Sequence, residues 1–201
     1  FQGALLGLAC GDAVGTTLEF ATRGSFTPLV DMVGGGPFSL KAGQWTDDTS
    51  MALCLAESLI VKGACDPHDQ MTRYANWYEG GYWSSTGSCF DIGMATKAAL
   101  HQFLLTGEAL AGSEDPHSAG NGSLMRLAPI AMRYGGDETL VKEMAALSSR
   151  TTHGAAECLD ACRLFSVALG RALNGGSKAE VLDLADLRLQ SHKIQAIAEG
   201  G

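Results

Sequence analysis

The chain has 201 residues, a length that suits one well-developed hydrophobic core or two small domains. Hydrophobic residues make up 46% and charged residues 18%, the composition of a globular chain and not of a disordered one. The net charge is -8 without any run of Lys or Arg, so a nucleic-acid surface has no electrostatic support, and no apolar run reaches the length of a membrane span. We expect neither a nucleic-acid nor a membrane partner.

The first half of the chain predicts two helices joined by a long loop. Ala, Leu and Gly are abundant whereas Val and Ile are few, which favours helices over strands. The opening stretch, FQGALLGLACGDAVG, predicts a helix of small residues packed closely against its neighbours. Residues 20–45 predict a long loop that includes three consecutive glycines. A second helix is expected from about Asp47 to Lys62, ending at Gly63.

The second half predicts further helices separated by two loops. Asp66 and Pro67 supply an N-cap and a first-turn proline for a helix to about residue 78. The loops are SSTGSCFDIG, before a helix ending near residue 107, and GEALAGSEDPHSAGNG. Later helices are expected at roughly 122–134, 137–149, 153–173 and 177–189, with Pro129 kinking the first. No polar linker divides the chain, so we expect one compact all-α, multi-helix domain over residues 1–201.

The six cysteines indicate free thiols. None of them forms a CxxC pair, and most lie within apolar helical patterns. Buried free thiols are therefore expected in preference to disulfides or a zinc site. Because free thiols persist in a reducing compartment, and no signal peptide is visible, we expect a cytoplasmic protein.

The segment WTDDTS at the start of the second helix has two interpretations. Asp and Thr side chains cap helices, because they accept hydrogen bonds from the free N–H groups of the first turn. One cap needs one such residue, whereas Thr46, Asp47, Asp48 and Thr49 place four side by side. Oxygen ligands at this density are also the ligands of Mg²⁺, so a metal site is the competing hypothesis.

Three other segments carry candidate functional residues. Asp12 and Glu19 lie in an apolar, Gly-rich stretch and could converge with the two aspartates of the second helix. The loop GNGS precedes a predicted helix start, where exposed backbone N–H groups suit a diphosphate, although Asn-Gly is also an ordinary turn. Arg126 could reach a phosphate or pair with an acid. His153 lies at a predicted helix start, where a histidine is either structural or functional.

These segments together resemble the ADP-ribosylglycohydrolase family, which includes the dinitrogenase-reductase-activating glycohydrolases. The matching pieces, in order, are GALLGLACGDAVGTTLEF, WTDDTSMALCLAESL, GNGSLMRLAPIAM and SSRTTHGAAECLDAC. The resemblance covers nearly the whole chain. It implies an all-α fold with a centre of two Mg²⁺ ions, sometimes Mn²⁺, in a cleft. The implied function is a hydrolase that removes ADP-ribose from a protein side chain or from a small ADP-ribose conjugate.

The resemblance also implies roles for individual residues. Thr46, Asp47 and Asp48 match the family's first cluster of metal ligands, and Glu19 matches the acid that ends its first motif, near metal and substrate. The residues that match its substrate contacts are Asn121, Gly122 and Ser123 of the phosphate and ribose loop, and His153; Asp91 lies in a segment that lines the family's cleft. A carboxylate among Glu19, Asp47 and Asp48 would take a proton from the attacking water while positive charge builds on the ribose.

One part of the family pattern is not found in these 201 residues. The family has a second acidic cluster of the form Gly-Asp-Asp-x-Asp-Thr that completes its two-metal site. GGDETL, at residues 135–140, lies between earlier motifs and predicts a helix N-cap instead. We therefore expect a family domain that lacks its C-terminal metal-binding segment, with half of the metal shell absent.

Two other functions compete with ADP-ribose removal. A different two-metal hydrolase, such as one acting on a phosphoester, would share the carboxylates but would not need His153 or the Asn121 loop. A non-catalytic ADP-ribose-binding or structural relative is the other alternative, and the absent acidic cluster favours it. Among modified side chains we favour arginine-linked ADP-ribose, because an acidic rim suits a guanidinium leaving group and Asp91 could meet it.

Overall fold

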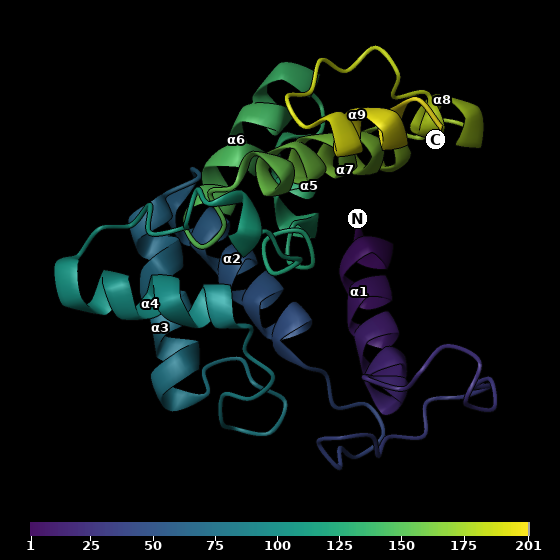
Figure 1. The fold of residues 1–201 in the computed structure, drawn as a ribbon, viewed down its shortest axis with the longest axis vertical. Helices are drawn as coiled ribbons and strands as arrows, with labels where there is room; N and C mark the ends of the chain where they lie inside the picture. Colours follow the sequence, from purple (N-terminus) through teal and green to yellow (C-terminus); the bar gives the residue numbers. More distant parts are fainter. Residues whose placement is uncertain (201) are drawn as a thin grey trace.

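The computed structural model describes residues 1–200, and over these residues the chain is all-α. Figure 1 shows the helices, whose bounds are α1 (Gln2–Gly15), α2 (Asp47–Lys62), α3 (Pro67–Gly80), α4 (Met94–Thr106), α5 (Ala128–Tyr134), α6 (Glu138–Arg150), α7 (Ala156–Leu173), α8 (Lys178–Leu182) and α9 (His192–Ala198). Short 3₁₀ turns occur at Thr16–Leu18 and Pro116–Ser118. The described residues form only two isolated β-bridges and no sheet. The predicted helical fold is confirmed.

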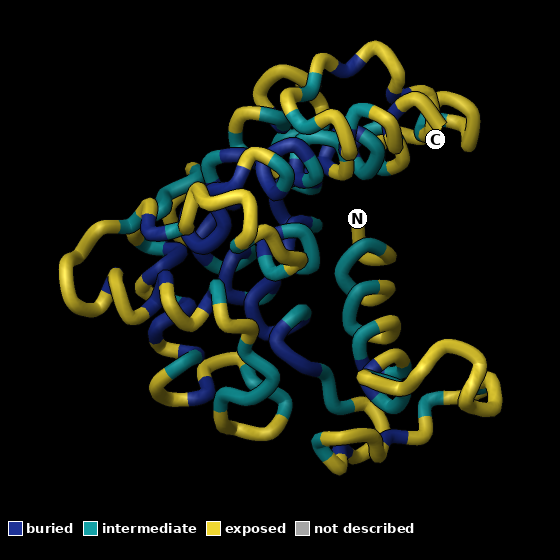
Figure 2. Tube along the Cα trace, in the orientation of Figure 1, coloured by how far each residue is buried: buried dark blue, intermediate teal, exposed yellow. Residues whose placement is uncertain are grey.

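The hydrophobic core forms around α2. Met51 and Leu55 of α2 are fully buried, as are Tyr74 of α3, Leu100 of α4 and Ile130 of α5. In Figure 2 the buried part of the chain runs along α2 and into the helices that surround it. Because α2 contributes buried residues from Asp47 to Leu59, its first turn is held rigidly at the end where the candidate residues lie. No helix within residues 1–200 has both the length and the apolarity needed to cross a bilayer.

The predicted end of one helix and the predicted N-caps of two others are confirmed. α2 ends at Gly63, which has a φ of 68° and donates its N–H to the carbonyl of Leu59. Asp66 caps α3, since its carboxylate accepts hydrogen bonds from the N–H groups of His68 and Asp69. Asp137 caps α6 in the same way, so the GGDETL segment is a helix start.

The expectation that α1 packs closely against its neighbours is wrong. Ala13 is its only buried residue within the described chain, and a Cβ built on Gly3, Gly7, Gly11 or Gly15 would meet nothing within 4 Å. In Figure 2, α1 is mostly exposed or half-buried. The small residues of α1 therefore do not serve a close helix–helix contact in this structure.

Three predicted helix boundaries also differ. The helix expected from residue 122 begins at Ala128, with Pro129 in its first turn, where proline is tolerated, so no kink forms. The helix expected from residue 153 begins at Ala156, which leaves His153 in the preceding turn. Residues 177–189 form only the short α8 before an irregular segment leads to α9. In all three places the chain turns although the apolar spacing of the sequence is typical of a continuous helix.

Candidate functional site

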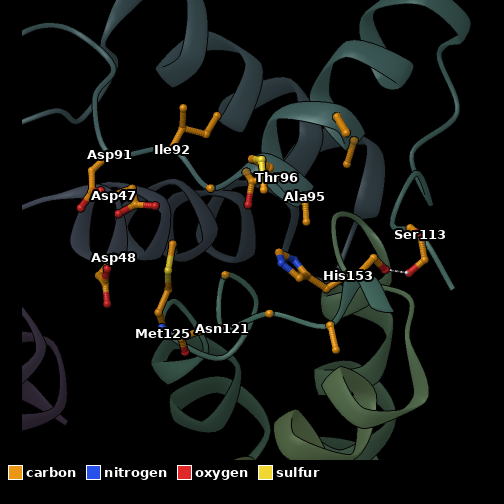
Figure 3. A pocket seen from close by; sticks show the side chains of 18 of the residues that line it. Asp47, Asp48, Asp91, Ile92, Ala95, Thr96, Ser113, Asn121, Met125 and His153 are labelled. Atoms are coloured by element: carbon orange, nitrogen blue, oxygen red, sulfur yellow. Dashed lines mark hydrogen bonds between the residues drawn. The ribbon is translucent and has the colours of Figure 1, made fainter. Parts of the chain in front are cut away.

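A cavity of about 850 Å³ gathers seven of the residues that the sequence singled out. It lies between the start of α2, the segment entering α4, the long loop before α5 and the turn between α6 and α7. Figure 3 shows the aspartates at one end of this cavity and His153 at the other. The seven residues are Glu19, Asp47, Asp48, Asp91, Asn121, Gly122 and His153. Segments far apart in the sequence thus line one space large enough for a nucleotide-sized ligand.

Thr46 lies at a smaller adjoining cavity of about 310 Å³. Glu19, Asp48 and Asp91 line both cavities, so the two spaces meet at the carboxylates. Asp12 lines the smaller cavity as well. The convergence of Asp12 and Glu19 with the aspartates of α2, which the sequence suggested, is therefore present in the fold.

The start of α2 is capped by Asp12 of α1 and not by its own aspartates. The Asp12 carboxylate accepts hydrogen bonds from the backbone N–H and the hydroxyl of Thr46, and from the same two groups of Thr49, at 2.7 to 3.1 Å. The Thr46 side chain makes no capping bond of its own. A carboxylate from another helix thus supplies what the first turn needs, and a capping role does not account for Asp47 and Asp48.

The carboxylates at this end of the cavity repel one another. Burial, followed by the neighbouring Asp48 carboxylate, raises the pKa of Asp47 to about 8. Burial, followed by Asp12, raises the pKa of Asp48 to about 6. Burial together with Glu19 holds the pKa of Asp91 well above its usual range. Within residues 1–200, none of these carboxylates forms an ion pair with a basic side chain.

Crowded carboxylates without a basic partner are the donor set that a hard cation would neutralise. Asp47 and Asp48 come from adjacent positions of one helix turn, and Glu19 and Asp91 approach from other segments. No group of three or more His, Cys, Asp and Glu side chains in the described part of the chain is arranged closely enough to hold a metal ion. The residues present suit a cation in charge and ligand type, but they do not form a closed metal shell.

The Asn121 loop forms a turn instead of leading directly into a helix. The carbonyl of Asn121 accepts hydrogen bonds from the N–H groups of Leu124 and Met125, and α5 starts only at Ala128. Asn121 is exposed and Gly122 half-buried at the cavity. The buried Ser123 does not line this cavity, because its hydroxyl accepts a hydrogen bond from Ser149 at 2.8 Å. Only the first part of the predicted loop faces the space.

His153 is held tightly between the Asn121 loop and the turn that follows α6. It is 4% exposed, and its Nδ1 lies 2.8 Å from the hydroxyl of Thr152. A Cβ on Gly122 would lie 2.7 Å from Cε1 of His153, so glycine is required for this approach. Burial, followed by the positive charge of Arg126, lowers the pKa of His153 to about 4, so the imidazole is neutral near pH 7.

Arg126 takes neither of the two roles that the sequence suggested. It is fully buried, and its guanidinium hydrogen-bonds to Thr151 and Thr152 and lies 4.5 Å from the centre of the Tyr74 ring. It pairs with no acid in the described part of the chain, and it does not line the cavity.

Several residues that line the cavity carry no recognisable motif in the sequence. The entrance to α4 contributes Ile92 and Thr96, and Phe20 follows directly after Glu19. Phe20 is 79% exposed with a φ of 61°, a left-handed conformation that is uncommon for a bulky residue. Its position next to Glu19 was the only available hint, because an exposed phenylalanine has no distinguishing pattern.

Comparison with known proteins supports the resemblance seen in the motifs. A protein named ADP-ribosylarginine hydrolase Tri1, from Pseudomonas putida (strain GB-1), is 48% identical over 181 residues, covering 90% of this chain and 48% of the relative. ADP-ribosyl-[dinitrogen reductase] glycohydrolase of Rhodospirillum rubrum is 35% identical over 158 residues, covering 75% of this chain and 50% of the relative. The chain therefore spans about half the length of the curated relatives it matches.

A solved structure and a family profile agree with these relatives. The structure, described as an ADP-ribosylglycohydrolase-related protein complex, superposes with a TM-score of 0.86 at 42% identity, covering 99% of this chain and 65% of that one. The profile of the family described as ADP-ribosylglycohydrolase matches residues 1–199. The motifs, the helical fold and these matches together show that the chain belongs to the ADP-ribosylglycohydrolase family.

Proposed function

We propose that this protein hydrolyses the glycosidic bond between ADP-ribose and a modified protein side chain, with arginine as the favoured acceptor. The observation that carries this proposal is the single cavity that joins the carboxylates of α2 to Asn121, Gly122 and His153. Family membership supports the reaction class, and relatives named ADP-ribosylarginine hydrolase support the acceptor. The partners we propose are an ADP-ribosylated protein or a small ADP-ribose conjugate. The free cysteines of the structure favour a reducing, cytoplasmic setting.

We assign substrate binding to the end of the cavity opposite the aspartates. Asn121 offers an exposed amide and Gly122 a backbone that a ligand can approach closely, and His153 presents a ring edge beside them. These groups suit the hydroxyl and phosphate oxygens of ADP-ribose. Ser123 belongs to this loop by sequence, and we give it the supporting role that its buried hydrogen bond to Ser149 indicates.

We assign Mg²⁺ binding to Thr46, Asp47 and Asp48, with two ions expected in the complete family site and Mn²⁺ as a substitute. The unpaired, crowded carboxylates support this assignment, since hard oxygen ligands suit Mg²⁺. A bound divalent ion would lower the pKa of a coordinated water and offset the repulsion among the carboxylates. The ligands of the second acidic cluster would be needed in addition to these three residues.

We propose Glu19 as the general base for the attacking water. Glu19 lines both cavities, and Thr16 donates a hydrogen bond to its carboxylate at 3.5 Å. Asp47 is poorly suited to this step because its carboxylate is a proposed ligand of Mg²⁺ and would be held by the cation. Asp91 lies in the left-handed region with a φ of 59°, and the loop before it directs it toward the same end of the cavity. We propose that Asp91 meets the guanidinium of an arginine acceptor.

The test is release of ADP-ribose from arginine-modified and serine-modified peptides by the full-length protein with Mg²⁺. We expect faster release from the arginine peptide. Asp91→Ala should reduce release from the arginine peptide and affect the serine peptide less. Asp91→Asn keeps the shape of the side chain without its charge, so it is the matched control for loss of the charge alone. Faster release from the serine peptide, or undiminished arginine activity in Asp91→Ala, would contradict the choice of acceptor.

A non-catalytic ADP-ribose-binding protein is the second candidate function. The specific observation in its favour is that the described carboxylates do not form a closed metal shell. Calorimetry with ADP-ribose distinguishes the two functions when combined with the release assay. Binding without release, even with Mg²⁺ and the full-length protein, would identify the binding protein, and binding that survives Asn121→Ala combined with His153→Ala would show that the cavity is wrongly assigned.

A further inference from the structure

Arg126 is a buried cation without an acidic partner in the described part of the chain. Its guanidinium is 0% exposed, and its Nη2 donates to the hydroxyls of Thr152 at 2.8 Å and Thr151 at 3.0 Å. Its Nε has no hydrogen-bond partner, although it too is buried. Burying a positive charge against neutral oxygens and the Tyr74 ring is costly, so stability alone gives no reason for an arginine here.

The contacts of Thr152 determine which way its hydroxyl points. A guanidinium can only donate, so the oxygen of Thr152 accepts from Arg126. The hydroxyl proton then needs an acceptor of its own. Within residues 1–200, the other group at hydrogen-bond distance from this oxygen is Nδ1 of His153, at 2.8 Å. Thr152 therefore donates to Nδ1, and Nδ1 carries no proton.

The state of His153 follows from this chain of hydrogen bonds. An imidazole whose Nδ1 accepts, and which is kept neutral by burial and by the nearby Arg126, carries its one proton on Nε2. Nε2 lies on the cavity side of the ring, 3.4 Å from the position of a Cβ on Gly120 and 3.2 Å from that of a Cβ on Gly122. Figure 3 shows the ring between the Asn121 loop and the start of α4.

We propose that Arg126 and Thr152 are positioning residues that hold His153 as a neutral donor, with its Nε2–H directed into the cavity toward an oxygen of the ligand. Arg126 touches no ligand in this arrangement; it orients Thr152, which sets the proton of His153. The site is then selective at this point for a hydroxyl or phosphate oxygen that accepts a hydrogen bond, and it rejects a group that can only donate. The identity of the ligand rests on the proposed function, whereas the position of the proton does not.

Nuclear magnetic resonance of the ligand-free protein tests the position of the proton directly. With ¹⁵N-labelled histidine at about pH 7, the ring nitrogens of His153 should show an unprotonated, hydrogen-bonded Nδ1 and a protonated Nε2. The other four histidines serve as references, and His153→Gln identifies the signals. A proton on Nδ1, or a rapidly exchanging mixture of both forms, would overturn the proposal without any other variant being needed.

Variants at Thr152 test the positioning role. Thr152→Val keeps the shape without the hydroxyl, so the Nδ1 signal should move toward that of a nitrogen without a hydrogen bond, and Thr152→Ser should restore it. An Nδ1 signal unchanged in Thr152→Val would show that Thr152 does not act on His153. Circular dichroism of each variant confirms that it is folded; if Thr152→Val is unfolded, the wild-type and Thr152→Ser spectra still decide the result.

Calorimetry with ADP-ribose connects this arrangement to the ligand. Thr152→Val should weaken binding by about 3- to 10-fold, the range expected for one hydrogen bond. In a His153→Ala background the same change should weaken binding less than about 2-fold, because the two residues act in series. Equal effects in both backgrounds would overturn the positioning role. Absence of any ADP-ribose binding by the full-length protein, with the expected nitrogen signals present, would refute the proposed function and leave the proton assignment intact.

Discussion

Replacing Asp47 with asparagine should stabilise the metal-free protein near neutral pH. Asp47 is 6% exposed, and its side chain forms no ion pair within residues 1–200. Its pKa rises from 3.8 to about 8 on folding. Between these values the native state retains a proton that the unfolded state has released, so the free energy of unfolding falls as the pH rises. At about 1.4 kcal/mol for each pKa unit, the cost at pH 7 is about 4 kcal/mol.

Urea denaturation in the presence of a chelator, at about pH 4.5 and about pH 7.5, measures this effect. Asp47→Asn should be more stable than the wild type by several kcal/mol at the higher pH, and the difference should shrink to about 1 kcal/mol at the lower pH. Asp66→Asn is the matched control, because Asp66 is a half-buried cap with a lowered pKa, asparagine caps helices equally well, and the ion pair with Lys62 that is lost is a partly exposed one. A variant less stable than the wild type at the higher pH, or a difference independent of pH, would show that Asp47 is not held protonated in the native state.

Three further changes test other parts of the structure. Asp12→Ala removes the hydrogen bonds that join α1 to the start of α2, so it should lower the free energy of unfolding by about 2–3 kcal/mol in chemical denaturation. Asp12→Asn should lose less stability, and equal losses in the two variants would contradict this account. Gly122→Ala places a Cβ 2.7 Å from Cε1 of His153, so it should lower the free energy of unfolding by about 1–3 kcal/mol and shift the ring signals of His153. An unchanged melting temperature would show that the loop moves aside without loss of stability. Asp160→Ala removes a buried carboxylate that accepts hydrogen bonds from the N–H groups of residues 190 and 191 and pairs with Arg163, so it should cost about 3 kcal/mol in thermal unfolding. Glu157→Ala, which removes a surface ion pair, is the nearly neutral comparison.

Binding of Mg²⁺ adds a separate prediction about Asp48. An ion that binds only the native state raises its stability, so the full-length protein should melt at a higher temperature when Mg²⁺ is added. Asp48→Asn should lose most of that increase, because the variant lacks a charged oxygen at the proposed metal site. If Asp48→Asn keeps the full response of the wild type to Mg²⁺, the assignment of this residue as a ligand is wrong.

Local chemistry in the sequence was sufficient to predict most of the helices. Gly63 ends α2 because glycine adopts the left-handed conformation without strain, and Asp66 with Pro67 starts α3 because one side chain caps while the ring fixes φ. Asp137 caps α6 for the same reason, and its place before Glu138 was recognisable in the sequence. Helix caps and helix-ending glycines act over three or four residues, so they can be recognised in a single sequence. They failed for residues 122–127 and 153–155, where apolar helical spacing continues through turns that tertiary contacts impose.

The motifs of the sequence singled out seven of the residues that line the cavity, yet they could not assign each residue its contacts. The sequence alone could not show that Asp12 would cap a helix 34 residues away, because that hydrogen bond depends on how α1 meets α2. Nor could it show that Ser123 turns into the core while Asn121 faces the cavity, or that Arg126 binds neutral hydroxyls instead of an acid. Local propensity and motif spacing therefore determined the helices and the composition of the site. Long-range packing decides which side chains are buried next to one another. Only this packing determined the charges, the proton positions and the hydrogen-bond partners within the site.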